Sequence, residues 1–319
     1  MRALVFDKKL KFRRDYPVPE PGPEEALIRV LMAGICDTDL EIIKGYMDYQ
    51  GILGHEFVGK VEKVMDPSAE SMTGKRVVGE INCGCGSCSL CLQNLERHCP
   101  RRSVMGIQNR NGCFSDYIVL PVRNLLEVPA GLSDEEAVFC EPLAAAMEII
   151  EQSHIKPTEN ILVLGDGKLG ILTALVLSRT AKVTLAGRHP EKMEKVREKY
   201  IQTSLSRNIR GPFDVVVEAA GSHQGREQAL TLVRPRGRVI LKSTVAEQKP
   251  WNVNSAVINE ITLIGSRCGP FEPALRAMEH GLDVRPLISG VYPLEEAETA
   301  VKEAGEKESL KILLDMRSG

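Results

Sequence analysis

Residues 161–178 read ILVLGDGKLGILTALVLS, and this segment is the clearest indication of the fold in the middle of the chain. Its first four residues have the composition of a buried strand, and the apolar run after the glycines has the length of a helix. Gly165, Gly167 and Gly170 lie between them in the spacing G-x-G-x-x-G. In this context the spacing is typical of a dinucleotide-binding loop, because the first glycine permits the tight turn, the second lets the backbone approach the pyrophosphate and the third lets helix pack on strand. A glycine-rich turn without a ligand is the alternative.

Apolar runs and helix-like segments alternate on both sides of this loop. Strands are expected at 161–164, 182–185, 215–217, 239–241 and 261–264, with helices over 169–179 and from near Pro190. This alternation predicts a parallel sheet with helices on both faces. About the first 130 residues instead look β-rich, with strands at 26–32, 57–64 and 117–120, before a capping box at Ser133 and Glu136. A further helix is expected near 273–280. The length of 319 residues predicts two domains.

The end of the second expected strand bears on the choice of nucleotide. An acidic residue at this position commonly binds the ribose 2′-hydroxyl of NAD. Here the segment 184–189 reads TLAGRH, so Gly187 takes that position and Arg188 and His189 follow. A carboxylate repels a 2′-phosphate and an arginine pairs with it, so the segment favours NADP over NAD. An exposed loop arginine is the alternative.

Four cysteines follow the pattern C-x2-C-x2-C-x7-C, namely Cys85, Cys88, Cys91 and Cys99. Four thiolates satisfy a tetrahedral zinc ion, and the short gaps let one tight loop aim its sulfurs at one centre. The spacing therefore predicts a structural zinc site. Four unrelated thiols and an iron–sulfur cluster are the alternatives. Cys83 is interpreted as a spare thiol, with its substitution for Cys85 left open.

A second set of metal-binding residue types is spread along the chain. Cys36 lies in GICDTD (34–39), His55 and Glu56 lie in GHEFVG (54–59), and Glu141 follows Cys140 far downstream. One thiolate, one imidazole and one or two carboxylates can hold zinc and leave a position for water or substrate. The combination predicts a catalytic zinc site.

Charge and hydropathy exclude several classes of protein. With 41 basic and 43 acidic residues the formal charge is −2, so no global field attracts nucleic acid or an anionic membrane. The basic run over 8–14 is interpreted as a solvated hairpin. No segment resembles a signal peptide or a membrane helix, which predicts a cytoplasmic protein without a membrane partner. Disulfides rarely persist in the cytosol, so the nine cysteines favour metal binding.

Several motifs occur together in one order: GICDTD, GHEFVGKV, the four-cysteine segment, EPLAAA, GDGKLG, FDVVVEAAG and LVRPRGRVILKS. In this order they resemble the zinc-dependent medium-chain alcohol dehydrogenase superfamily over essentially the whole chain. Glu141 in an EPL motif, instead of a cysteine, resembles the threonine and polyol dehydrogenase branch. The resemblance implies a GroES-like β-barrel catalytic domain over 1–141 and 268–319, with a zinc lobe at about 83–100. It also implies a Rossmann domain over 142–267 and an active site in the cleft.

The resemblance also implies roles for individual residues. Cys36, His55 and Glu141 become the first-choice zinc ligands, and Glu56 a fourth ligand or a residue that exchanges with water. Thr38 matches the hydroxyl that relays the alcohol proton, and Asp39 the group that orients His55. Glu41 stands where a relay histidine is common, and Asp37 where some members place a phosphate-binding arginine. The expected nucleotide contacts are Gly165, Asp166, Gly167, Lys168, Leu169, Gly170, Gly187, Arg188, His189, Ala219, Ser243, Ser266 and Arg267.

The implied activity is hydride transfer between a nicotinamide cofactor and an alcohol or carbonyl substrate, with zinc at both sites. Segments 46–50 and 110–114 are expected to line the substrate pocket. The resemblance also implies a homo-oligomer, either a dimer or a tetramer. The alternatives are an NAD-dependent polyol or sugar-phosphate dehydrogenase, and a non-catalytic NADP-binding redox sensor.

Overall fold

The computed structural model describes residues 1–196, 200–244 and 249–317. The chain divides into two compact units. Unit 1 comprises Met1–Glu141 and Phe271–Gly319, and unit 2 comprises Pro142–Pro270. Unit 1 is therefore discontinuous in sequence, and unit 2 is inserted into it. The sequence-based boundary between the second and third segments lies at 267/268, three residues earlier.

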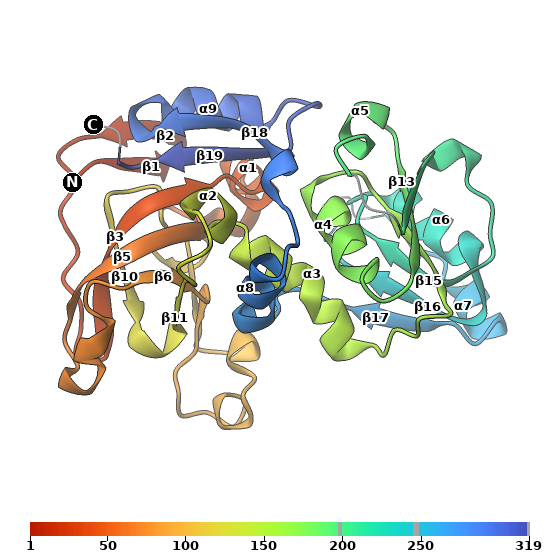
Figure 1. Ribbon diagram of the computed structural model, residues 1–319, viewed down its shortest axis with the longest axis horizontal. Coiled ribbons are helices and arrows are strands. Elements are labelled where there is room, and N and C mark those ends of the chain that lie inside the picture. Colours follow the sequence, from red (N-terminus) through yellow and green to blue (C-terminus); the bar gives the residue numbers. More distant parts are fainter. Residues whose placement is uncertain (197–199, 245–248, 318–319) are drawn as a thin grey trace. The chain divides into compact units, whose positions relative to one another are not determined.

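Unit 2 is built on a six-stranded sheet in which all neighbouring strands pair parallel, in the order β14-β13-β12-β15-β16-β17. Four of these strands, β13, β15, β16 and β17, are labelled in Figure 1. Its strands are β12 (Asn160–Leu164), β13 (Lys182–Gly187), β14 (Ile201–Leu205), β15 (Phe213–Glu218), β16 (Val233–Leu241) and β17 (Thr262–Gly265). The parallel sheet confirms the prediction. The strand order reverses between β12 and β15, and ligands of such sheets bind at the carboxyl ends beside this reversal.

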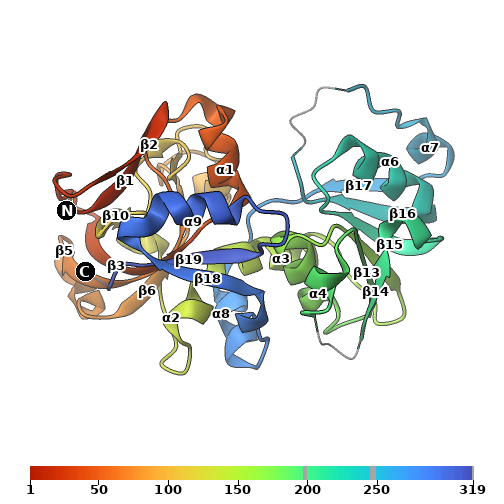
Figure 2. The same cartoon turned by 90° about the horizontal axis from the view of Figure 1, so that it is seen from above.

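Helices cover both faces of this sheet. Helix α4 (Lys168–Leu177) joins β12 to β13, and α6 (His223–Leu232) joins β15 to β16 on the other face (Figure 2). Apolar side chains of β12 and α6 share one core cluster, which contains Leu162, Leu164 and Leu230. The helix expected from Pro190 begins there but forms one turn, α5 (Pro190–Met193), before the first undescribed residues. Helix α7 (Asn254–Ile258) precedes β17.

Unit 1 contains a larger, mixed sheet of seven strands in the order β11-β6-β5-β3-β19-β18, with β10 also pairing with β3. Its strands are β3 (Glu25–Gly34), β5 (Glu56–Val64), β6 (Arg76–Gly79), β10 (Tyr117–Pro121), β11 (Leu125–Glu127), β18 (Ile288–Pro293) and β19 (Lys311–Asp315). The strands expected at 26–32, 57–64 and 117–120 are confirmed as β3, β5 and β10. Helix α9 (Ala297–Ala304) packs on β18 and β19 (Figure 2).

Two small sheets complete unit 1. Strands β1 (Ala3–Asp7) and β2 (Lys9–Arg13) form the antiparallel hairpin expected for the basic run, and β4 (Gly51–Ile52) pairs with β1. Strands β7 (Asn82–Cys83), β8 (Ser103–Met105) and β9 (Asn109–Arg110) flank the four-cysteine segment.

Short helices link these sheets. Ser133 accepts a hydrogen bond from the Glu136 backbone and Glu136 accepts one from the Ser133 backbone, so the capping box of α2 (Asp134–Ala137) is confirmed. Helix α1 (Asp37–Ile43) follows β3, and α8 (Phe271–Glu279) confirms the helix expected near 273–280. Among the described residues, no helix has both the length and the apolarity that crossing a membrane requires.

Candidate metal centres and nucleotide-binding edge

The sulfurs of Cys85, Cys88, Cys91 and Cys99 converge on one point. All four lie within 4.8 Å of one another, and the Sγ–Sγ distances are 3.9 Å for Cys85–Cys91, 3.5 Å for Cys88–Cys91 and 3.7 Å for Cys88–Cys99. A tetrahedral zinc ion with bonds of about 2.3 Å separates its sulfurs by about 3.8 Å. The donor set therefore fits structural zinc. Cys83 points elsewhere: its sulfur lies near Ile81 O and Asn124 Nδ2.

The cysteines of this group differ in acidity, since burial and the neighbouring Cys88 raise the pKa of Cys91 to about 11 whereas Cys85 favours the thiolate. Hydrogen bonds from the Ser87 backbone and hydroxyl, which outweigh partial burial, lower the pKa of Cys85 to about 5. Arg101 Nη2 also donates to Cys85 Sγ over 3.1 Å. Gly86 has φ of +73°, a conformation that side chains disfavour, and this lets the loop turn between Cys85 and Cys88. Metal ligation requires the thiolate, so the loop is arranged for a cation.

Cys36, His55 and Glu56 form a second group, with one ligand atom from each within 4.8 Å of the others. Cys36 caps the N-terminus of α1, and His55 and Glu56 lie where β5 begins. Strands β3 and β5 pair so that Gly34 is opposite Glu56, which places the start of α1 beside His55. The structure thus brings together three of the four residues expected at the catalytic zinc site.

Asp39 organises this second group. Its Oδ2 accepts a hydrogen bond from the Cys36 backbone over 2.8 Å, and its Oδ1 accepts one from the Gly54 backbone over 3.2 Å and lies 3.3 Å from His55 Nδ1. Burial alone lowers the pKa of His55, but the charges of Asp39 and Cys36 outweigh it, and the pKa lies well above its usual value. The negative charges that hold a proton on this imidazole equally favour a metal cation.

Glu56 is held by a partner that the sequence analysis missed. Lys311, on β19, contacts Glu56 Oε2 through Nζ, and both side chains are almost fully buried. Burial lowers the pKa of Lys311, but the charge of Glu56 outweighs burial and raises it. Glu56 Oε1 is also buried, with no hydrogen-bond partner among the described residues. One carboxylate oxygen is thus fixed by an ammonium while the other is left unsatisfied, which fits a metal ligand.

Glu141 is half-buried in the first turn of α3 (Cys140–Gln152). It is not part of the group found within 4.8 Å among the described residues. Burial raises its pKa to about 7, the charge of His55 lowers it and the charge of Glu56 raises it. Glu141 is therefore close enough to interact electrostatically with the metal-binding group, and its role as a ligand stays a prediction.

The expected proton-relay residues lie on α1. Thr38 Oγ1 is 3.7 Å from Cys36 Sγ, beside the candidate ligands. Glu41 is exposed, and its Oε1 accepts a hydrogen bond from Lys44 Nζ over 2.8 Å. Thr38 therefore lies at the site, whereas Glu41 forms a surface ion pair.

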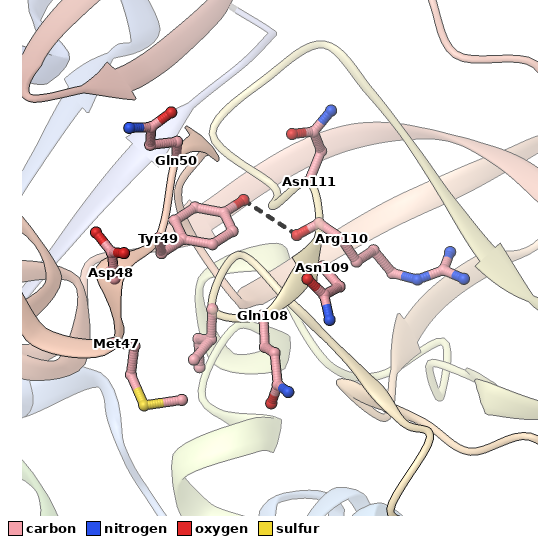
Figure 3. A pocket seen from close by; sticks show the side chains of 9 residues that line it. Met47, Asp48, Tyr49, Gln50, Gln108, Asn109, Arg110 and Asn111 are labelled. Carbon is pink, nitrogen blue, oxygen red and sulfur yellow. Dashed lines mark hydrogen bonds between the residues drawn. The ribbon is translucent and has the colours of Figure 1, made fainter.

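A pocket of about 320 Å³ is lined by 47–50 and 107–111, which overlap the two segments expected to contact substrate (Figure 3). Gly112, Cys113 and Phe114 of the second expected segment do not line it. Tyr49 closes one side, where its single hydroxyl proton is shared between Ile52 O at 2.7 Å and Arg110 O at 3.0 Å. The Arg110 guanidinium is engaged by Glu25 Oε1 and Val119 O. Most of the lining is polar and comprises Met47, Asp48, Tyr49, Gln50, Ile107, Gln108, Asn109, Arg110 and Asn111.

The glycine loop of unit 2 has the close approaches that its spacing predicts. Gly165 has φ of +121°, and a Cβ there would collide with Ala219 O. A Cβ on Gly170 would collide with Gly165 O, so helix α4 needs glycine to approach the strand. Gly167 caps α4 and faces open space, which leaves the helix N-terminus accessible to a phosphate. Lys168 and Leu169 form the first turn of this helix.

The other expected nucleotide contacts also lie at the carboxyl ends of strands. Ala219 directly follows β15, Ser243 lies two residues after the end of β16, and Ser266 and Arg267 follow β17. The buried Glu218, which was not expected from sequence, links the loop after β15 to Ser243: Oε1 accepts from the Ala220 and Gly221 backbones, and Oε2 accepts from Ser243 Oγ. Lys242 Nζ similarly binds Ser266 Oγ and Arg267 O.

The turn after β13 contains a carboxylate that the sequence analysis did not place there. Asp166, from the glycine loop, accepts hydrogen bonds from the backbones of Arg188 and His189. Arg188 is exposed, and His189 is half-buried. The prediction of NADP rested on the absence of a carboxylate from this turn.

Comparisons with known proteins agree with this geometry. Residues 22–130 match the family model described as the alcohol dehydrogenase GroES-like domain. L-threonine 3-dehydrogenase of Streptomyces avermitilis is 30% identical over 99% of both chains. Alcohol dehydrogenase TADH of Thermus sp. ATN1 superposes with a TM-score of 0.90 at 28% identity over 99% of both chains. A Sinorhizobium meliloti 1021 protein assigned as a zinc-binding dehydrogenase and bound to NADP gives a TM-score of 0.89 at 26% identity over 98% of both chains.

Proposed function

This chain belongs to the zinc-dependent medium-chain alcohol dehydrogenase superfamily, in its threonine and polyol dehydrogenase branch, and on this premise we propose that it interconverts an alcohol and a carbonyl compound by hydride transfer to or from a nicotinamide dinucleotide. The observation that carries the proposal is the convergence of Cys36, His55 and Glu56 in a chain that also has an open glycine loop. Electrophilic zinc and a hydride carrier are the two components that this reaction needs.

Unit 1 has the groups that would hold the metal and the substrate oxygen. Bound zinc supplies a Lewis acid that lowers the pKa of an alcohol hydroxyl or polarises a carbonyl. Cys36 and His55 would hold it, with Asp39 Oδ1 at 3.3 Å from Nδ1 of the imidazole, and a carboxylate would complete the set. Glu56 is the carboxylate inside the 4.8 Å group, and Glu141 is the further candidate.

The substrate proton needs an acceptor near the metal. Thr38 Oγ1, which lies beside Cys36, takes this proton from the substrate hydroxyl and passes it towards solvent in the direction of oxidation. Glu41 is ion-paired with Lys44 at the surface, so it acts at most at the outer end of this route.

The lining of the pocket in unit 1 favours a polyhydroxylated substrate. Gln50, Gln108, Asn109 and Asn111 offer neutral amide donors and acceptors, which suit hydroxyl groups. The one arginine of the lining is already occupied by Glu25 and by a backbone carbonyl. A polyol therefore fits this lining better than a sugar phosphate does.

Turnover of a substrate panel tests the proposed function. Alcohols, polyols, 3-hydroxy amino acids and the corresponding carbonyl compounds are each incubated with NAD(H) and with NADP(H), and reduced nicotinamide is followed by absorbance. We expect turnover within this panel, strongest among polyols. A chain that binds zinc and nucleotide yet turns over no member would refute the assignment as a dehydrogenase and favour the redox-sensor alternative.

We also propose a homodimer, formed by edge-to-edge pairing of β17. This strand pairs only with β16 among the described strands, so its outer edge has open backbone donors and acceptors. Val257 and Ile258 of the adjoining α7 are 76% and 78% exposed, and Leu263 of β17 is also exposed. A second copy related by a two-fold axis would pair this edge and cover these side chains.

Sedimentation of the wild-type chain and of the variant Val257→Glu/Ile258→Glu tests this interface. The wild type should sediment as a dimer, or as a tetramer that contains this dimer, and the variant should dissociate because the interface would bury four carboxylates. Ile150→Glu, which also replaces an exposed apolar residue of unit 2, is the control. Dissociation by the control alone, or a monomeric wild type, would contradict the interface.

A further inference from the structure

The side chain of Asp166 occupies the space at the nucleotide-binding turn in which a side chain at position 187 would lie, and position 187 is glycine. A Cβ built on Gly187 would overlap the Cβ, Cγ and Oδ2 of Asp166. The carboxylate therefore lies at the end of β13, although it comes from the glycine loop after β12. Asp166 and Gly187 form a matched pair, because the space admits one side chain and the sequence supplies it from position 166.

The Asp166 carboxylate also occupies the donors of the turn. Its Oδ2 accepts hydrogen bonds from the Arg188 backbone over 2.7 Å and the His189 backbone over 2.5 Å, and lies 3.1 Å from His189 Nδ1. Two consecutive backbone N–H groups followed by an imidazole are the donors with which such a turn could bind a 2′-phosphate. Here they are already bound to an internal anion.

The Asp166 carboxylate is negatively charged, and its Oδ1 has no described hydrogen bond. Burial alone raises the pKa of Asp166, but the hydrogen bonds from His189 and Arg188 outweigh burial and lower it, so the group is ionised at neutral pH. The described hydrogen bonds of this side chain all go to Oδ2. Oδ1 can accept a further hydrogen bond, and a ribose hydroxyl is a suitable donor.

We propose that Asp166 is the residue by which this chain selects NAD(H) over NADP(H). Its Oδ1 accepts a hydrogen bond from the adenosine ribose diol. Its charge and the occupied Arg188 and His189 backbone donors disfavour a 2′-phosphate, even beside the exposed Arg188 side chain. This inference rests on the proposed function, because it requires a nicotinamide dinucleotide at the glycine loop. The sequence alone predicts a preference for NADP, because Gly187 lacks a carboxylate and Arg188 follows it. The inference replaces that prediction, because Asp166 of the glycine loop supplies a carboxylate at the end of β13.

The affinities of NADH and NADPH for the full chain, measured separately by calorimetry, test the inference. The wild type should bind NADH roughly 10- to 100-fold more tightly than NADPH, the range expected for one hydrogen bond to a charged group. Asp166→Asn removes the charge with little change in shape and should reduce this ratio by most of that factor. Asp214→Asn is the matched control. Asp214 also accepts a hydrogen bond from a backbone N–H, that of Asn160, and forms an ion pair with Arg234, but it lies at the amino end of β15.

A swap variant separates the charge from its position in the sequence. Asp166→Gly/Gly187→Asp moves the carboxylate from the loop to the strand end, into the same space, and should restore the preference for NADH that Asp166→Asn loses. A wild type that binds NADPH as tightly as NADH, or a ratio that Asp166→Asn leaves unchanged, would overturn the inference while leaving the proposed dehydrogenase intact. Failure of both nucleotides to bind would overturn the proposed function, and the inference with it.

Discussion

Replacing Cys36 with alanine is expected to reduce turnover by at least about three orders of magnitude, which corresponds to about 4 kcal/mol of transition-state stabilisation. The thiolate is one of three ligand atoms within 4.8 Å, and no other described cysteine lies in this group. His55→Ala should have a similar effect on turnover. Steady-state rates on a substrate found in the panel measure the loss.

The fold and the binding of nucleotide should survive both substitutions. Cys36 and His55 belong to unit 1, whereas the glycine loop belongs to unit 2. Thermal unfolding and calorimetric titration with NADH therefore serve as controls on the same preparations. Near-wild-type turnover in either variant would show that these residues do not hold the electrophile.

Replacing Cys88 with serine is expected to destabilise the chain without removing a group from the reaction. Its sulfur lies 3.5 Å from that of Cys91 and 3.7 Å from that of Cys99, as one of the four converging sulfurs. Structural zinc contributes directly to folding free energy. Loss of about 3 kcal/mol corresponds to a decrease in melting temperature of roughly 10 °C for a unit of this size. Differential scanning calorimetry and zinc analysis measure the two effects.

Cys83→Ala is the matched control for Cys88→Ser. Cys83 is a buried cysteine of the same segment whose sulfur faces Asn124 and a backbone carbonyl, outside the group of four. This variant should retain its zinc and its activity. An unchanged melting temperature with abolished activity in Cys88→Ser would reverse the assignment of the structural and catalytic sites.

Local sequence patterns predicted most of the fold. Strand β12, the glycine loop and α4 could be located because a buried parallel strand, a tight turn and a buried helix each have a distinct composition. The capping box at Ser133 was similarly visible, since it depends on two residues three positions apart. Strand β14, IQTSL, was missed because an edge strand with exposed polar residues lacks an apolar pattern.

The sequence spacing alone predicted one of the two candidate metal sites, whereas the other depended on the family resemblance. The four cysteines of the lobe lie within one loop, so their spacing alone predicted their convergence. Cys36 and His55 depend on the pairing of β3 with β5, which the resemblance supplied and the spacing did not. Lys311 lies 255 positions from Glu56, and no local sequence pattern marks it. Its ion pair with Glu56 could be identified only from the structure, in which β19 pairs with β3.

The turn at Gly187 shows why single positions mislead. Because position 187 is glycine, the sequence predicts a turn without a carboxylate. Position 166 fills the same space, because the loop after β12 lies against the end of β13. A residue pair 22 positions apart, Asp166 and Arg188, therefore determines the electrostatics of this turn.

The cytoplasmic location stays a prediction.

The zinc content and turnover of one wild-type preparation show whether the zinc held by Cys36 and His55 is the electrophile. We expect about two zinc ions per chain, one in the four-cysteine lobe and one at Cys36 and His55. We also expect that a chelator removes activity in parallel with the zinc at Cys36 and His55, and that added zinc restores it. Full turnover in a preparation that holds only the zinc of the lobe would contradict this assignment of the electrophile.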